Sequence, residues 1–182
     1  TLSIKLEAIP SRYNVSPGQD NPVISKHKNS TSLSPMSWGL VPNWAKDPNP
    51  KIKPINARAE TLSEKPSFKD LLFKQRCLIP ADGYYEWQVT GTNKIPHYIH
   101  LPDMSTFAFA GIWDNWKRDN CNTLLSYSII TTEAAEPIRF IHHRMPVILP
   151  EKHWQKWLDS SVPVHSLPKI LQDGRNDRTY SR

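Results

Sequence analysis

Two strands separated by a sharp break are predicted by one stretch of the chain, Arg76-Cys77-Leu78-Ile79-Pro80-Ala81-Asp82-Gly83-Tyr84-Tyr85-Glu86-Trp87. Its first part, Arg76–Ile79, is an apolar run typical of a buried strand. Pro80 and Gly83 are expected to interrupt strand pairing, and the chain becomes extended again from Tyr84. The stretch therefore favours a β-rich fold.

Glu86 is the candidate proton donor or acceptor of this stretch. Successive residues of a strand face opposite sides, so Glu86 shares a face with Tyr84, while Tyr85 and Trp87 share the other. Apolar surroundings disfavour the charged form of a carboxylate, and such a group can move protons near neutral pH. The alternative is a solvated Glu on an edge strand, which is the commoner situation for this residue type.

The composition indicates a basic domain with a polyanionic partner. The chain has 182 residues, a formal net charge of +6 and a sequence pI of about 9.3, and residues 1–58 hold eight Lys or Arg against three Asp or Glu. This length is enough for one domain with a hydrophobic core. A basic surface makes nucleic acid the first candidate partner. The seven Trp agree, since exposed rings stack on unpaired bases, although most should pack in the core.

Two cysteines, Cys77 and Cys121, exclude a disulfide framework and a Cys-based zinc site. We expect Cys77 to be an inert core residue. Neither a signal peptide nor a membrane-spanning run is recognisable, so we expect a protein that is not secreted, in the cytoplasm or nucleoid of a bacterium or the nucleus of a eukaryote. No cofactor is expected, and no metal, because His142 and His143 should point apart on an extended chain.

Apolar and alternating patterns predict the remaining elements of a single β-rich α+β domain. Helices are expected over 67–74, over part of 133–140 and after Pro150, with Trp154, Trp157 and Leu158 on the buried face of the last. Residues 45–53 are expected to form a basic loop. Further strands are expected over 12–19, 23–24, 36–44, 98–101, 107–113, 124–131 and 147–149.

Polar groups alternate along Ile55–Thr61, so Asn56, Arg58 and Glu60 would share one face of an extended segment. An amide, a guanidinium and a carboxylate on one face are costly unless they are used or solvated. This segment is therefore a second candidate for function.

Five segments in order resemble the SRAP family, the SOS response-associated peptidases that process abasic sites in single-stranded DNA. The resemblance extends from about Arg12 to Leu158. It implies a curved, mostly antiparallel, barrel-like sheet with a few short peripheral helices, in a single domain over residues 1–182. The segments are 12–17, 38–44, 56–61, 76–87, and 129–132 leading to 142–146.

The resemblance also implies a chemistry. In this family an N-terminal cysteine, exposed when the initiator Met is removed, attacks the aldehyde of an opened abasic sugar and forms a thiazolidine crosslink. Asn56 would orient the amine or the sugar, and Glu86 would shuttle protons and assist removal of the Met. His142 would protonate the ring oxygen of the sugar, a role suited to the titration range of histidine.

Four further residues match the DNA-binding positions of the family. Arg58 and Arg144 would grip phosphates, although each could instead form an ion pair inside the fold. Trp38 and Trp87 would contact the unstacked bases of the strand. The expected partner is single-stranded DNA with an abasic site, bound by a monomer.

The family begins with Met-Cys-Gly-Arg, and no such segment occurs here. Thr1 falls inside the N-terminal region of the family, and neither Cys77 nor Cys121 matches the nucleophile. We therefore expect missing segments at both ends, and covalent activity only in an intact form. Two alternatives stay open: a noncovalent single-strand-binding module that has lost the chemistry, and an unrelated hydrolase with Thr1 as its nucleophile.

Overall fold

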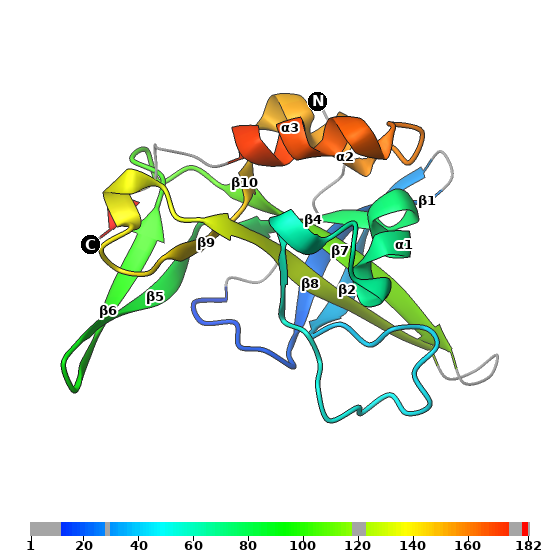
Figure 1. Ribbon diagram of the computed structural model, residues 1–182, viewed down its shortest axis with the longest axis horizontal. Helices are drawn as coiled ribbons and strands as arrows, with labels where there is room; N and C mark the ends of the chain where they lie inside the picture. The colour runs from blue at the N-terminus through cyan, green and yellow to red at the C-terminus, as the bar shows by residue number, and fades with distance from the viewer. Residues whose placement is uncertain (1–11, 28–29, 118–122, 175–179, 182) are drawn as a thin grey trace.

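A closed barrel of five strands forms the centre of the fold in the computed structural model, which describes residues 12–27, 30–117, 123–174 and 180–181 (Figure 1). The strands pair in the order β7-β4-β1-β2-β8, and β8 returns to β7. All pairs of this ring are antiparallel except β2 with β8. The predicted barrel-like, mostly antiparallel sheet is confirmed. The barrel strands are β1 (Asp20–His27), β2 (Ser30–Trp38), β4 (Arg76–Ala81), β7 (Phe107–Lys117) and β8 (Thr123–Glu133).

Three short strands extend the barrel at one end. On β8, β3 (Asn56–Arg58) pairs in parallel and β9 (Arg144–Pro146) pairs antiparallel, while β10 (Ile148–Leu149) pairs with β7. Thr131 of β8 is the register partner of residues on both β3 and β9. Segments that are more than 80 positions apart in sequence therefore lie beside the same part of β8.

A smaller sheet carries Glu86 and projects from the barrel as a hairpin (Figure 1). It contains β5 (Gly83–Thr90), β6 (Asn93–His100) and β11 (Tyr180–Ser181). The break between β4 and β5 falls at Asp82 alone, so the expected interruption at Pro80 is wrong. Pro80 is tolerated within β4 because β1 pairs with β4 only at Cys77 and Leu78, and one side of the strand is free beyond them.

Gly83 begins β5 because the ring of Tyr98 packs directly on its backbone. A Cβ atom at position 83 would lie 2.3 Å from Cζ and 2.4 Å from the hydroxyl oxygen of Tyr98. Real Cβ atoms do not approach other atoms so closely, so only glycine permits this contact. The contact joins the start of β5 to β6, where Gly83 is also the register partner of His100.

Helices cover one side of the barrel (Figure 1). They are α1 (Pro66–Lys74), α2 (Trp154–Leu158) and α3 (Leu167–Asp173), with 3-10 turns at Ala59–Thr61, Glu136–Ile138, Glu151–His153 and Val164–Ser166. Phe68, Leu71 and Leu72 of α1 are buried, as its sequence pattern predicts. Within the described ranges, no helix combines the length and the apolar character needed to cross a membrane.

A buried arginine ties this helical layer to the barrel. Arg76, at the start of β4, is 3% exposed, and its guanidinium donates hydrogen bonds to the carbonyls of Leu72, Phe73, Trp157 and Asp159. The indole N–H of Trp157 donates to the carbonyl of Cys77 at 2.9 Å. These bonds satisfy carbonyls at the ends of α1 and α2, which lack partners within their own helices.

Two predicted strands differ from the structure. Residues 12–19 are irregular, and extended structure begins at Asp20. The strand expected over 36–44 ends at Trp38, because Gly39 has a φ of 127°, which is unfavourable for other residues. Glu60 lies in the 3-10 turn after β3, so it does not continue the strand face of Asn56 and Arg58.

Gly111 of β7 is closely surrounded by β4 and β8, so we expect Gly111→Ala to destabilise the fold by about 2 kcal/mol. A Cβ there would lie 2.5 Å from Cδ1 of Ile79, 2.9 Å from Sγ of Cys77 and 3.0 Å from the carbonyl oxygen of Ser128. Because Ile79→Val removes the Cδ1 atom, the double variant should be more stable than the sum of the two single changes, by roughly 0.5 kcal/mol or more.

Urea unfolding of the four proteins in this cycle measures the coupling. Gly18→Ala is the contrast, since Gly18 has a positive φ of 87° and no atom within 4 Å of its Cβ position, whereas Gly111 is crowded and has no positive φ. It reports the cost of the backbone conformation alone. Strictly additive energies in the cycle would mean that Gly111 is not constrained by its contact with Ile79.

Candidate functional site

One open cleft of about 1650 Å³ contains all the side chains that the sequence singled out. Its walls come from the barrel, from β5 and β6, and from the irregular segment 12–17. The sequence-predicted residues that line it are Trp38, Asn56, Arg58, Glu86, Trp87, His142 and Arg144. The cleft brings them together, while the role of each stays a prediction.

Strand β8 explains how distant segments reach the cleft. Asn56 is the register partner of Ile129, and Arg144 is that of Glu133, so β3 and β9 lie along the same stretch of β8. Asn56 is exposed, and its side-chain amide has no hydrogen bond within the described residues. This amide is therefore available to a ligand.

Glu86 is half-buried and carries no ion pair within the described part of the chain. Its Oε1 accepts a hydrogen bond from the N–H of Trp87 at 3.1 Å. Of the three neighbouring rings, only that of Tyr84 shares its face of β5, and Tyr85 and Trp87 are 44% and 48% exposed on the other face. Two of the three neighbouring rings therefore do not cover the carboxylate.

Tyr84, which sequence reasoning did not single out, lies on the same face of β5 as Glu86. Its hydroxyl is buried without a hydrogen-bond partner among the described residues, and Tyr84 lines the cleft. Burial, and then the negative charge of Glu86, raise the pKa of Tyr84. The phenol therefore stays protonated and is a hydrogen-bond donor with no partner among the described residues.

His142 has a backbone partner for either protonation state of its Nδ1 atom. The N–H of Arg144 donates to Nδ1 at 3.1 Å, and the carbonyl oxygen of Arg144 lies 3.2 Å from the same nitrogen. A bare Nδ1 accepts the first bond, and a protonated Nδ1 donates the second. The imidazole can thus gain or lose this proton without leaving the nitrogen unpartnered.

The expectation that His142 and His143 point apart is wrong. The chain is not extended there, and the two ring centroids are only 4.3 Å apart. His143 is the more exposed of the two. No group of three or more His, Cys, Asp or Glu in the described ranges is placed to hold a metal ion.

The two arginines differ in their surroundings. The guanidinium of Arg144 binds both carboxylate oxygens of Glu60 at 2.9 Å and also donates to the carbonyl oxygen of Thr131 at 2.8 Å. This hydrogen bonding is the main cause that lowers the pKa of Glu60. Arg58 is exposed, and its side chain has no hydrogen bond or ion pair within the described residues. Arg58 is the arginine that is free to meet a phosphate, whereas Arg144 already has a partner.

The two tryptophans also differ. The indole N–H of Trp38 donates to the carbonyl oxygen of Ile55 at 2.9 Å, and its ring stacks on Tyr127 at 6.5 Å with an interplanar angle of 7°. One face of Trp38 is therefore already occupied. Trp87 has no ring contact among the described residues, so it is the freer stacking surface.

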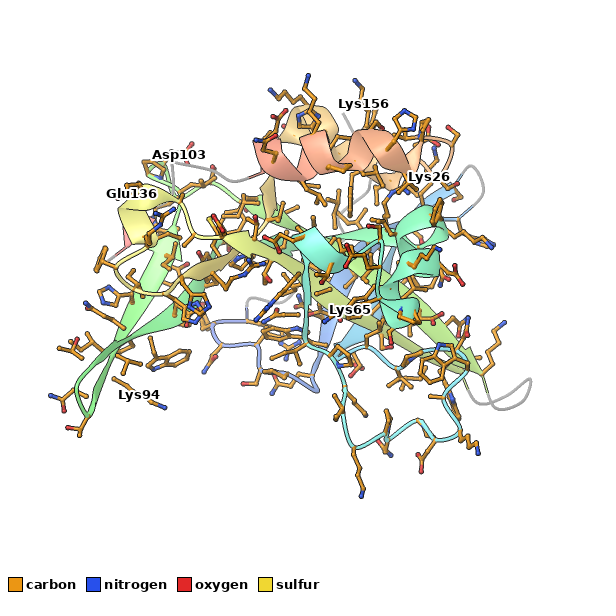
Figure 2. The ribbon with its side chains drawn as sticks, viewed as in Figure 1. Lys26, Lys65, Lys94, Asp103, Glu136 and Lys156 are labelled. Atoms are coloured by element: carbon orange, nitrogen blue, oxygen red, sulfur yellow. The ribbon has the colours of Figure 1, made fainter. Side chains whose placement is uncertain are left out.

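Lys65 also lines the cleft, although no motif around it predicts a role. It directly precedes α1, is exposed, and adds to the cleft a second cation that, like Arg58, has no ion pair among the described residues. Figure 2 shows Lys65 far from Lys156, which lies on the helical layer. Cys77 is fully buried, and burial raises the pKa of its thiol well above the ordinary value, so it is inert as expected. Thr1 and Cys121 lie outside the described residues.

Comparisons with known proteins show which proteins this chain resembles. The family model described as SOS response associated peptidase (SRAP) matches residues 3–180. The abasic site processing protein YoqW of Bacillus subtilis is 45% identical over 161 residues, which cover 88% of this chain and 70% of that protein. The abasic site processing protein HMCES of Xenopus tropicalis is 35% identical over 196 residues, with 90% of this chain and 58% of that protein covered.

Solved structures share the fold. A protein from Bacteroides thetaiotaomicron superposes with a TM-score of 0.80 at 34% identity, over 90% of this chain and 73% of that one. A phage-related protein from Bordetella bronchiseptica also gives a TM-score of 0.80, at 27% identity, over 99% of this chain and 84% of that one.

The pair between Arg144 and Glu60 should make stability depend on pH in the acid range. The lowered pKa of Glu60 means that the pair stabilises the fold above the ordinary value of 4.5 and is lost as pH falls through the folded-state pKa. Glu60→Gln should therefore be less stable than the wild type at pH 7, by about 1 kcal/mol or less because Glu60 is partly solvated. This difference should shrink as the pH falls below 4.5.

Urea unfolding between pH 7 and pH 3 checks this dependence. Glu136→Gln is the matched control, because Glu136 pairs with Arg139 at 3.5 Å with both side chains largely exposed, and its removal should have almost no effect. A constant difference between Glu60→Gln and the wild type across this range would contradict the role of the pair.

Proposed function

The chain belongs to the SOS response-associated peptidase (SRAP) family, and from this membership we propose that it processes abasic sites in DNA, bound as single strands. One observation carries the proposal. A single open cleft holds the amide of Asn56, the carboxylate of Glu86 and the imidazole of His142 beside the unpaired guanidinium of Arg58.

The cleft suits a single strand better than a duplex. Phosphates can meet Arg58 and Lys65, while Trp87 offers an exposed ring on which an unpaired base can stack. Base stacking of this kind requires that the base has left its partner strand. The abasic residue, which has no base to stack, would then lie against the polar side chains of β3 and β9.

We further propose that the intact form, with an N-terminal cysteine, captures the lesion covalently. His142 gives a proton to the ring oxygen of the abasic sugar while the anomeric hydroxyl loses one, which opens the ring to an aldehyde. The cysteine amine adds to this aldehyde, water leaves, and the thiol closes a thiazolidine on the resulting imine. The backbone of Arg144 holds Nδ1 of His142 and so fixes the ring, which supports a role for Nε2 as the nitrogen that gives the proton.

Glu86 would move protons at the amine during this capture. Its half-buried carboxylate has no competing ion pair within the described residues. Removal of the initiator Met by the protein itself belongs to the same proposal, with Glu86 handling the protons of peptide cleavage. The second candidate function is noncovalent single-strand binding, for which the free cations and rings of the cleft would suffice.

The salt dependence of binding tests the phosphate contact. Arg58→Ala should weaken binding to single strands of any sequence and flatten the slope of log affinity against log salt by about 0.7. Lys156→Ala removes the same charge on the helical layer, outside the cleft, and should leave the slope unchanged. Fluorescence anisotropy at several salt concentrations measures both, and equal slopes for all three proteins would exclude a phosphate contact at Arg58.

A denaturing gel separates covalent capture from plain binding. Full-length protein incubated with an abasic single strand should give a band that migrates as a covalent complex. His142→Ala should slow its formation roughly 100-fold or more, the usual contribution of a general acid, with DNA affinity nearly unchanged. Glu86→Gln should slow both crosslinking and Met removal, the latter followed by intact mass.

His143→Ala is the matched control, since its ring lies beside His142 but is more exposed. A native-gel shift with no covalent band at any time would support the noncovalent function. Normal crosslinking rates in both His142→Ala and Glu86→Gln would remove these two residues from the mechanism.

A further inference from the structure

One part of the cleft has a composition unlike the rest. Six of its lining residues gather around the break between β4 and β5, and we call this group the Asp82 pocket. Within it there is no Lys or Arg, and its one charged side chain is a carboxylate. The members are Asp82, Gly83, Tyr85, Tyr98, Met104 and Thr106.

Tyr98 gives the Asp82 pocket a fixed aromatic wall. Its ring packs on the backbone of Gly83, where even a Cβ atom could not be accommodated. The rings of Tyr85 and His100 hold it from two directions, with centroids 5.3 Å and 5.5 Å away. A ring held this firmly does not have to be ordered when a flat ligand stacks on it.

Met104 adds an apolar side chain to the lining of the cleft, two residues before Thr106, which binds Asp82. It is 54% exposed, and it is the only described residue other than glycine with a positive φ, at 55°. Its N–H donates to the carbonyl oxygen of Leu101 at 3.0 Å, and Asp103 binds the N–H and hydroxyl of Ser105. These hydrogen bonds keep the backbone of Met104 in its unusual conformation. The loop thereby exposes a flexible thioether, a group that packs well against aromatic rings.

Asp82 provides a carboxylate of which only one oxygen accepts a hydrogen bond from a described residue. Its Oδ1 accepts the hydroxyl of Thr106 at 2.6 Å, while Oδ2 has no hydrogen bond within the described residues. The side chain is exposed. A carboxylate repels phosphate, so the part of a nucleic acid that suits this pocket is a base and not the backbone.

We propose that the Asp82 pocket binds the unpaired base next to the abasic site and prefers guanine. The Watson–Crick edge of guanine presents two adjacent donors, N1–H and the N2 amino group, and a carboxylate accepts two such bonds together. Thymine presents a single N–H between two carbonyl oxygens that the carboxylate repels. This inference rests on the proposed function and adds a base preference to it.

Binding of short single strands tests the preference. The probe carries a tetrahydrofuran residue, which mimics the abasic sugar but has no aldehyde and cannot be crosslinked. Each of the four bases is placed in turn on its 5′ side and on its 3′ side. Fluorescence anisotropy should show that guanine on one of these sides gives roughly five- to tenfold tighter binding than thymine.

Asp82→Asn should reduce this ratio to less than about twofold, because the amide offers a donor where guanine also offers donors. Asp70→Asn is the matched control: Asp70 is an exposed carboxylate of α1 outside the cleft, and its loss should leave the ratio unchanged. Met104→Gly suits the positive φ and removes the thioether, so it should weaken binding of all these strands while the protein stays folded.

The outcomes separate the two levels of the inference. Equal affinity for all four neighbouring bases, or a guanine preference that persists in Asp82→Asn, would overturn the pocket assignment while abasic-site binding stands. Failure of the wild-type protein to bind any abasic single strand would overturn the proposed function and the pocket with it. A preference lost in Asp82→Asn and kept in Asp70→Asn would establish the pocket.

Discussion

The cleft depends on one strand, β8, which pairs with β7 and β2 in the barrel and with β3 and β9 beyond it. Backbone N–H and C=O groups in a protein interior must find partners, so a strand with so many neighbours leaves little freedom to any of them. The amide of Asn56 and the imidazole of His142 are brought together by this pairing and not by any contact between their side chains. The placement of these two groups in the cleft is therefore a property of backbone register.

The strength of the sequence pattern decided how much of the fold could be predicted. Apolar runs such as Phe107–Trp113 and the spacing of Phe68, Leu71 and Leu72 indicated the correct elements, because burial alone determines them. The end of β2 could not be predicted, since it depends on the backbone conformation of Gly39. The face on which Glu60 would lie was assigned wrongly because β3 ends at Arg58 and Glu60 lies in the 3-10 turn that follows.

The members of the site were predictable from local motifs, but their partners were not. Nothing in the sequence connects Arg144 with Glu60, which lies 84 positions away, and the pairing changes what Arg144 can offer to a ligand. Lys65 and the Asp82 pocket were missed for a related reason. Their residues form a candidate site only in the folded protein, where a turn, a strand and a loop from separate parts of the chain lie together.

The contact between Gly83 and Tyr98 has a consequence for how this family can diverge. It fixes the register of β5 and β6 at the base of the hairpin, close in sequence to Glu86. The Gly91-Thr92 turn at the tip therefore does not have to set this register. A shift of one residue along the hairpin would turn Glu86 to the opposite face. Insertions at the tip can be absorbed there, whereas a change of length near Gly83 cannot. Relatives should therefore differ in the length of the β5–β6 hairpin while the carboxylate of Glu86 keeps its orientation. The tip of the hairpin can then evolve independently of the cleft.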